Sequence, residues 1–146
     1  MADQYDLIVI GAAGSRWKNS GLQFYSVAQV LRTAEMVRLD WQRTVLDPRM
    51  VPCVRSALAK EFGTAAQLVS FRRIAFPQIA DGARAYRAVA EAKTSAGKVR
   101  IMYDIVLVAS GRTEITLTAA APMSTAQIIA AAEAKPRGCC VVASAF

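Results

Sequence analysis

The stretch that decides the fold is residues 99–109, which read Val-Arg-Ile-Met-Tyr-Asp-Ile-Val-Leu-Val-Ala. Apolar side chains at the odd-numbered positions alternate with polar ones such as Arg100 and Asp104, a pattern that predicts a β-strand with one apolar face. Short glycine-containing segments at 95–98 and 110–112 flank this strand and predict tight turns. The strand is therefore expected to pair with its sequence neighbours in an antiparallel meander.

The remaining elements follow from hydrophobic periodicity and from the Gly and Pro residues that interrupt it. Three further strands are predicted at 68–76, 84–94 and 113–120. Helices are predicted at 26–46, with Ser26 as N-cap, at 52–62, and at 124–134. Because the strands follow one another directly, we expect an α+β fold with a four-stranded antiparallel sheet, two helices before it and one after it.

The 146 residues fit a single domain, which we place at residues 23–136. Residues 1–22 are predicted to be an atypical N-terminal extension that contains a short buried strand, a glycine turn and a polar linker at 15–21. Residues 137–146 are predicted to be a C-terminal tail.

The composition restricts the chemistry more than it identifies it. The chain has 18 Lys and Arg against 11 Asp and Glu, a net charge of +7, and no histidine. The charge favours anionic ligands, but no signal specific for nucleic acid is present. The absence of histidine excludes His-dependent triads and the commonest metal ligand. We expect no cofactor and no metal site.

Three cysteines, Cys53, Cys139 and Cys140, form no C-x-x-C pair. This spacing excludes a zinc ribbon or a thioredoxin-type site. Cys53 lies in an apolar stretch and is predicted to be a buried structural thiol. A disulfide between Cys53 and one of the other two is the alternative in an oxidising compartment.

Residues 5–14, Tyr-Asp-Leu-Ile-Val-Ile-Gly-Ala-Ala-Gly, resemble the start of flavin- and pyridine-nucleotide-dependent disulfide oxidoreductases. In that family a strand leads into a G-x-G-x-x-G loop that binds pyrophosphate. Gly11 matches the first glycine, but Ala13 and Arg16 occupy the second and third positions. An intact dinucleotide site is therefore not expected.

Residues 20–122 resemble a family of small secreted or lipid-anchored actinobacterial proteins of unknown function, and more loosely the extracellular sensor domain of mycobacterial serine/threonine kinases. The matching segments are 51–54, 75–77, 85–87, 103–108 and 111–117. The resemblance implies an antiparallel sheet flanked by helices, an extracytoplasmic location, and binding or sensing rather than catalysis. No export signal and no apolar run long enough to span a membrane are found.

We therefore predict a non-catalytic binding or sensing domain for a small-molecule or protein ligand, with an anion among the candidates. The alternatives are a remnant of a nucleotide-binding oxidoreductase that uses the Gly11 loop, and a purely structural or interaction domain. The predicted ligand contacts are Tyr86, Arg87, Tyr103 and Arg112.

Other polar and aromatic residues have weaker functional interpretations. Asp104 and Glu114 could form an acid–base pair if they faced each other across the last hairpin. Trp41 and Tyr103 could line a pocket, although core positions are commoner for such residues. The basic side chains on the strands are predicted to form cross-strand ion pairs with Glu91, Asp104 and Glu114 rather than an anion-binding surface.

Overall fold

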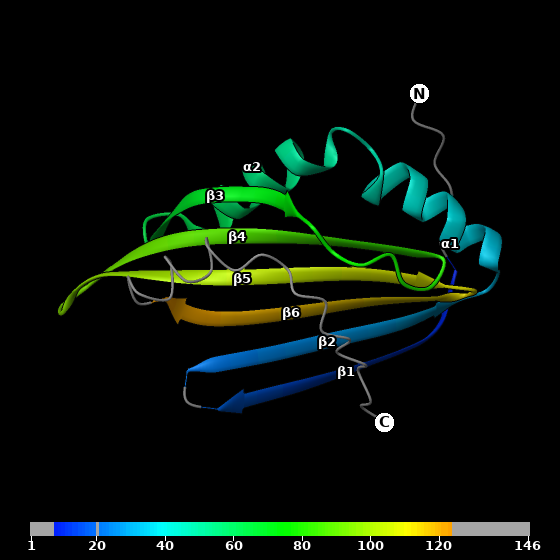
Figure 1. The fold of residues 1–146 in the computed structure, drawn as a ribbon, viewed down its shortest axis with the longest axis horizontal. Coiled ribbons are helices and arrows are strands. Elements are labelled where there is room, and N and C mark those ends of the chain that lie inside the picture. Colours follow the sequence, from blue (N-terminus) through cyan, green and yellow to red (C-terminus); the bar gives the residue numbers. More distant parts are fainter. Residues whose placement is uncertain (1–7, 20, 124–146) are drawn as a thin grey trace.

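The structure, a computed structural model, describes residues 8–19 and 21–123. Within these residues the chain forms one six-stranded antiparallel sheet with the order β1-β2-β6-β5-β4-β3, so that β1 and β3 are its edges (Figure 1). The strands are β1 (Val9–Asn19), β2 (Leu22–Leu31), β3 (Ala66–Ile74), β4 (Gly82–Thr94), β5 (Gly97–Ser110) and β6 (Thr113–Met123).

The helical segments lie between β2 and β3 in the sequence. They are α1 (Ala34–Asp40), the short π-helix η1 (Trp41–Val45) and α2 (Met50–Phe62). Thr33 caps α1, because its hydroxyl accepts a hydrogen bond from the backbone N–H of Met36 at 3.1 Å. α1 contacts β2 and β6, whereas α2 contacts β3.

The predicted fold class is wrong in the N-terminal third of the chain. The structure has six strands and two short α-helices in its described part, not four strands and three helices. Residues 26–31, predicted to begin a helix that runs to residue 46, belong to β2 instead, and Ser26 lies inside that strand rather than capping a helix. Alternate β2 side chains face the two sides of the sheet, so apolar residues fall on both, and their spacing in the sequence imitates a helical period.

β1 replaces the predicted strand, glycine turn and linker. Its eleven residues are all exposed, and they pair with β2 across a turn that contains Gly21 at φ +85°. Cross-strand side-chain contacts support the pairing: the Ser15 and Ser26 hydroxyls are 2.8 Å apart, and the Trp17 and Phe24 ring centroids are 5.6 Å apart. Because an edge strand has one unpaired side, polar residues are tolerated there.

The other elements are confirmed with shifted ends. The predicted helix at 52–62 is α2, and the four predicted strands are β3 to β6. The predicted helix at 124–134 and the tail at 137–146 lie outside the described residues.

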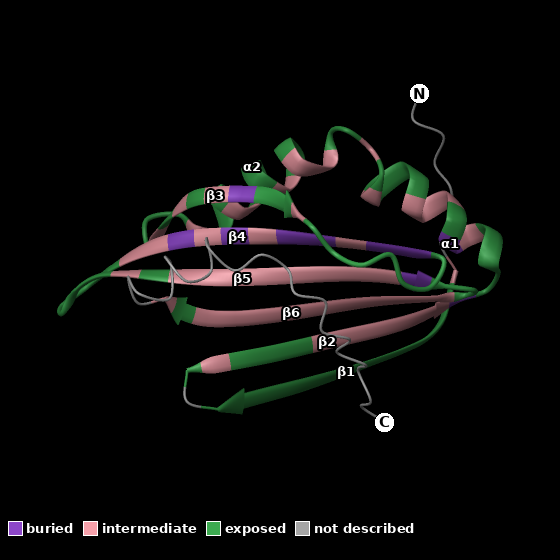
Figure 2. Cartoon of the chain, in the orientation of Figure 1, coloured by how far each residue is buried: buried purple, intermediate pink, exposed green. Residues whose placement is uncertain are grey.

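The core lies between the helical segments and one face of the sheet. The register places Tyr86, Ile105 and Thr118 in one row across β4, β5 and β6 on this face, and Tyr86 packs with Phe71 beneath α2. A smaller cluster of Leu31 and Ala109 packs against α1. Burial is concentrated in β4, where small alanine side chains alternate with larger residues, and it decreases toward β1 (Figure 2).

Candidate functional site

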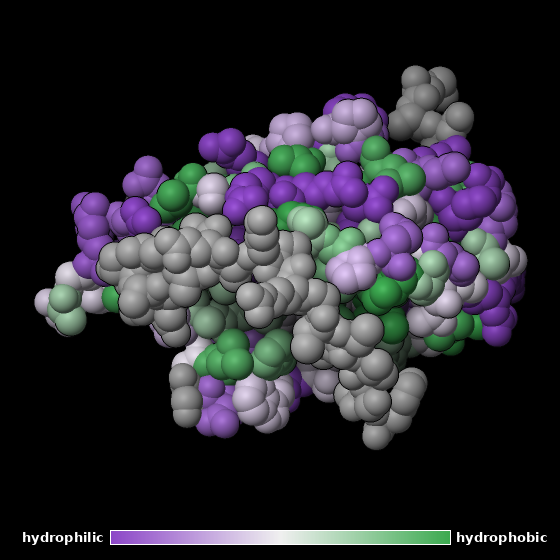
Figure 3. Space-filling model, in the orientation of Figure 1, coloured by the Kyte–Doolittle hydropathy of each residue, from purple (hydrophilic) through white to green (hydrophobic). Residues whose placement is uncertain are grey.

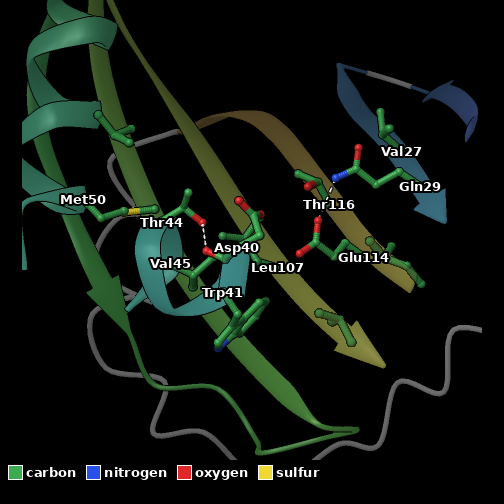
Figure 4. A pocket seen from close by; sticks show the side chains of 13 residues that line it. Val27, Gln29, Asp40, Trp41, Thr44, Val45, Met50, Leu107, Glu114 and Thr116 are labelled. Carbon is green, nitrogen blue, oxygen red and sulfur yellow. Dashed lines mark hydrogen bonds between the residues drawn. The ribbon is translucent and has the colours of Figure 1, made fainter. Parts of the chain in front are cut away.

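A cavity of about 320 Å³ opens between the α1–η1 segment and the β2–β6–β5 part of the sheet (Figure 4). Its polar lining residues are Gln29 on β2, Asp40 at the end of α1, Thr44 on η1, and Glu114 and Thr116 on β6. Apolar side chains that include Val27, Trp41, Met50 and Leu107 form the rest of the wall. A few polar groups in a largely apolar concavity are typical of small-molecule sites.

The π-helix sets the helical side of the cavity. The N–H of Leu46 donates to the carbonyl of Trp41 at 2.9 Å, which is the i→i+5 bond that defines a π turn. The Thr44 hydroxyl donates to the carbonyl of Asp40 at 2.6 Å. The cavity is lined by both Asp40 and Trp41, at consecutive positions where α1 meets η1 (Figure 4).

The strand register sets the opposite side. Gln29 on β2 lies directly across from Glu114 on β6, and Thr116 follows two residues later on the same face. The Gln29 side-chain amide Nε2 donates to Glu114 Oε2 at 2.7 Å (Figure 4). This bond fixes the Glu114 carboxyl with its other oxygen, Oε1, buried and without a donor among the described residues.

The electrostatics of the site are dominated by two carboxyl groups. Burial raises the pKa of Glu114, and the nearby Asp40 carboxyl raises it further, against the opposing effect of the Gln29 amide. A direct hydrogen bond between the two carboxyl groups requires a proton on one of them. The raised pKa therefore favours the protonated Glu114 carboxyl, and a donor or cation at Oε1 would favour the carboxylate.

Trp41 separates this cavity from a second one. The second cavity, of about 330 Å³, is bordered by Val37, Leu46 and Ala109, and the Trp41 side chain lines both. Gly82 at the start of β4 makes room for the indole, since a β carbon at that position would lie 2.8 Å from Trp41 Cε2. Trp41 therefore lines a cavity and also packs against the core cluster of Leu31 and Ala109, whereas Tyr103 lines neither cavity.

The four residues predicted to contact a ligand do not converge on one site. Tyr86 is buried under α2, where its hydroxyl donates to the carbonyl of Val45 at 3.3 Å. Tyr103 lies on the same sheet face, with its ring centroid 6.1 Å from that of Phe62. Arg87 lies on the opposite face, and Arg112 is exposed in the β5–β6 turn. Their role in binding stays a prediction.

The cross-strand ion pairs are largely as predicted. Arg87 Nε donates to Asp104 Oδ1 at 2.6 Å, and Glu91 pairs with both Lys98 and Arg100. Figure 3 shows hydrophilic side chains in a band over β3 and β4. Glu114 is the exception, because its hydrogen bond comes from the Gln29 amide rather than from a cation.

Three other expectations are corrected by the structure. Asp104 and Glu114 cannot form an acid–base pair, because their register places them on opposite faces of the sheet. Gly11 lies within β1, so it opens no strand–turn–helix loop of the kind that binds a dinucleotide. Cys53 is an exposed free thiol on α2 rather than a buried one, whereas Cys139 and Cys140 lie outside the described residues.

Sequence reasoning missed Asp40 and Gln29. Both fall in segment 26–46, for which the sequence predicts a single helix, and a helical assignment does not predict the cross-strand pairing of Gln29 with Glu114. The available signal was Ser20-Gly21, a two-residue turn pattern between two segments with strand-forming residues.

Within residues 8–19 and 21–123, no cluster of three or more Cys, Asp or Glu side chains is arranged to hold a metal ion. In the same part of the chain, no helix is long and apolar enough to cross a membrane.

Comparisons with known proteins identify no family for this chain. No protein-family model and no curated protein sequence matches it. Among solved structures, it is similar to PA94 from Pseudomonas aeruginosa, a protein of unknown function, with 14% sequence identity, a TM-score of 0.33, and coverage of 94% of this chain and 89% of that chain. A structural similarity of this degree does not indicate a shared function.

Proposed function

We propose that this protein is a small-molecule-binding domain whose ligand occupies the cavity between the α1–η1 segment and the sheet. The observation that carries the proposal is the Glu114 carboxyl, which the Gln29 amide fixes at the cavity wall while Oε1 is left buried without a donor from residues 8–19 or 21–123. Buried polar atoms without a partner are rare and costly, because their desolvation is not compensated. A ligand that donates a hydrogen bond would remove that cost.

The surroundings of Glu114 support the same function. The volume of about 320 Å³ is at the lower end of the range of roughly 300–1,000 Å³ for ligand pockets. The adjoining π-helix is a rare element that often occurs at functional sites. The helical and strand residues that line the cavity belong to a packed scaffold, so the site is formed before a ligand arrives.

Methionine methyl groups provide a direct test. Met50 lines the cavity, whereas Met102 lies on the opposite face of the sheet. We expect a mixture of small aromatic fragments, with neutral, cationic and anionic members, to shift the methyl NMR signal of Met50 in protein labelled with ¹³C-methyl methionine. The Met102 signal should remain in place.

A pair of substitutions on β6 provides the matched control. Thr116→Phe fills the cavity, whereas Thr118→Phe adds the same ring on the same face of the same strand, outside the cavity lining. Fragment-induced shifts of Met50 should disappear in the first variant and persist in the second. Equal shifts of Met50 and Met102, or no shift of Met50 with any fragment, would contradict the proposed function.

A further inference from the structure

We propose that the ligand is an organic cation, specifically a protonated amine that carries an apolar group, and that its ammonium binds between Asp40 and Glu114. This inference rests on the proposed function and specifies the chemical class of the ligand. It is carried by the charge, the hydrogen-bonding capacity and the apolar walls of the cavity.

The charge inside the cavity opposes the charge of the whole chain. The chain carries +7, yet the only ionisable side chains among the described lining residues are the acidic Asp40 and Glu114. Among the described residues, no Lys or Arg side chain lines this cavity. An anionic ligand would meet two carboxyl groups in a partly desolvated space, where like charges repel more strongly than in water. The cavity therefore selects against the anions that the overall charge would attract.

The hydrogen-bonding groups favour a ligand that donates. Glu114 Oε1 is buried and accepts no hydrogen bond from a described residue, while Gln29 already occupies Oε2. An ammonium group has three donors and no acceptor. It can therefore donate to Glu114 Oε1 and to the Asp40 carboxyl at the same time. A neutral hydroxyl brings one donor and leaves the repulsion between the carboxylates in place.

The aromatic and aliphatic walls fit the remainder of such a ligand. Trp41 directly follows Asp40 and lines the cavity, and an indole is the side chain with the strongest attraction for cations over its ring face. Val27, Met50, Val54 and Leu107 provide an apolar wall. A substituent attached to the ammonium can bury its surface against these side chains.

Three probes with a common phenyl group test the charge preference. They are 2-phenylethylamine, 2-phenylethanol and 3-phenylpropanoate, which are cationic, neutral and anionic at pH 7. Titration calorimetry on the full chain, accompanied by the Met50 methyl signal, should show the amine binding about tenfold or more tightly than the alcohol, since hydrogen bonds to charged groups are the stronger ones. Binding of the propanoate should be the weakest.

Charge-removing variants assign the preference to the two carboxyl groups. Glu114→Gln and Asp40→Asn should each lower amine affinity by about tenfold while changing alcohol affinity little. Glu61→Gln removes the same charge from an exposed position on α2 and should leave both affinities unchanged. The methyl spectra of the variants report whether each variant is folded. If Glu114→Gln does not fold, Asp40→Asn alone provides the test.

The outcomes separate the two proposals. If the alcohol or the propanoate shifts Met50 and binds as tightly as the amine, the cavity is a binding site but the cation inference is overturned. The inference is also overturned if the amine binds equally well to wild type and to both cavity variants. If none of the probes or fragments shifts Met50, the proposed function itself fails.

Discussion

The Trp41 indole lies directly over Gly82, so close that a β carbon on this glycine would be 2.8 Å from Cε2. This contact joins the helical segment to the beginning of β4 and holds the indole between the two cavities. The position of Trp41, which forms one wall of the proposed site, thus depends on the absence of a side chain at Gly82 on β4.

Gly82→Ala should therefore destabilise the protein by about 1–3 kcal/mol, the usual cost of adding volume to a well-packed site. Urea denaturation followed by tryptophan fluorescence measures this, in a Trp17→Phe background that leaves Trp41 as the reporter. Gly11→Ala is the control, because nothing lies within 4 Å of a β carbon there. A Gly82→Ala variant as stable as Gly11→Ala would show that the indole does not pack as described.

Tyr86 is expected to act in stability rather than in binding. Its ring stacks on Phe71 at a centroid distance of 5.6 Å, and its hydroxyl donates to Val45. Tyr86→Phe should lower the free energy of unfolding by about 0.5–1.5 kcal/mol, the value of one hydrogen bond, without changing the affinity for 2-phenylethylamine. Calorimetric titration and urea denaturation of the same variant separate the two effects, and lost affinity at unchanged stability would favour Tyr86 as a ligand contact.

Arg87 is expected to act through Asp104. The two side chains are 22% and 26% exposed and form two hydrogen bonds. Arg87→Ala leaves the Asp104 carboxylate half-buried and without this partner, so stability should fall by about 1–3 kcal/mol. Lys98→Ala breaks a more exposed pair, in which Glu91 keeps Arg100, and should cost at most about 1 kcal/mol. Equal losses in thermal denaturation would contradict this assignment.

The raised pKa of Glu114 gives stability a pH dependence of known sign. The folded protein holds this proton more tightly than the unfolded chain, whose glutamates titrate near pH 4.3. The free energy of unfolding contributed by Glu114 therefore falls as pH rises from about 4 through the raised value. Glu114→Gln should remove that fall, so the variant should lose less stability than wild type between pH 4 and pH 8.

Asp47 provides a control in which the pH dependence of stability has the opposite sign. Side-chain and backbone hydrogen bonds from Arg49 lower the pKa of Asp47 to about 2. Its stabilising contribution is present above the unfolded pKa and is lost as pH falls toward 2. Asp47→Asn should thus remove this loss from the acid limb of the stability curve, and above about pH 5 it should lower stability by a constant amount without changing the slope of the curve. Stability curves of Glu114→Gln and wild type that run parallel from pH 4 to pH 8 would contradict the environment described for Glu114.

The part of the fold that could be predicted from the sequence is the part in which the hydrophobic residues recur with one unambiguous period. In β5 every odd-numbered position from 99 to 109 is apolar, which gives one continuous apolar face opposite Arg100 and Asp104, and the flanking turns at Gly97 and Gly111 have positive φ values, as such turns require. β2 is different, because Val27 and Leu31 face the helices whereas Val30 faces the other side. A strand with apolar residues on both faces has no unique period, and tertiary pairing with β1 and β6 decides its structure.

The candidate site was harder to predict because its carboxyl groups belong to elements that only the tertiary structure brings together. Glu114 was identified as a candidate acid from its place in the last hairpin, but its partner was assigned to Asp104. The two are separated by ten residues, and the strand pleat puts them on opposite faces. Asp40 carries no local motif, and its role follows only from the end of α1 lying over β6.

The most direct test of the cation site is a ¹³C-carboxyl NMR titration of Glu114, with and without saturating 2-phenylethylamine. The Glu114 signal can be assigned by its absence from the spectrum of Glu114→Gln. We predict a pKa above that of an ordinary glutamate in the free protein, and a lower pKa when the amine is bound, because a bound cation favours the carboxylate and the coupling is reciprocal. A Glu114 that titrates like an exposed glutamate, or whose pKa does not change with the amine, would contradict the account.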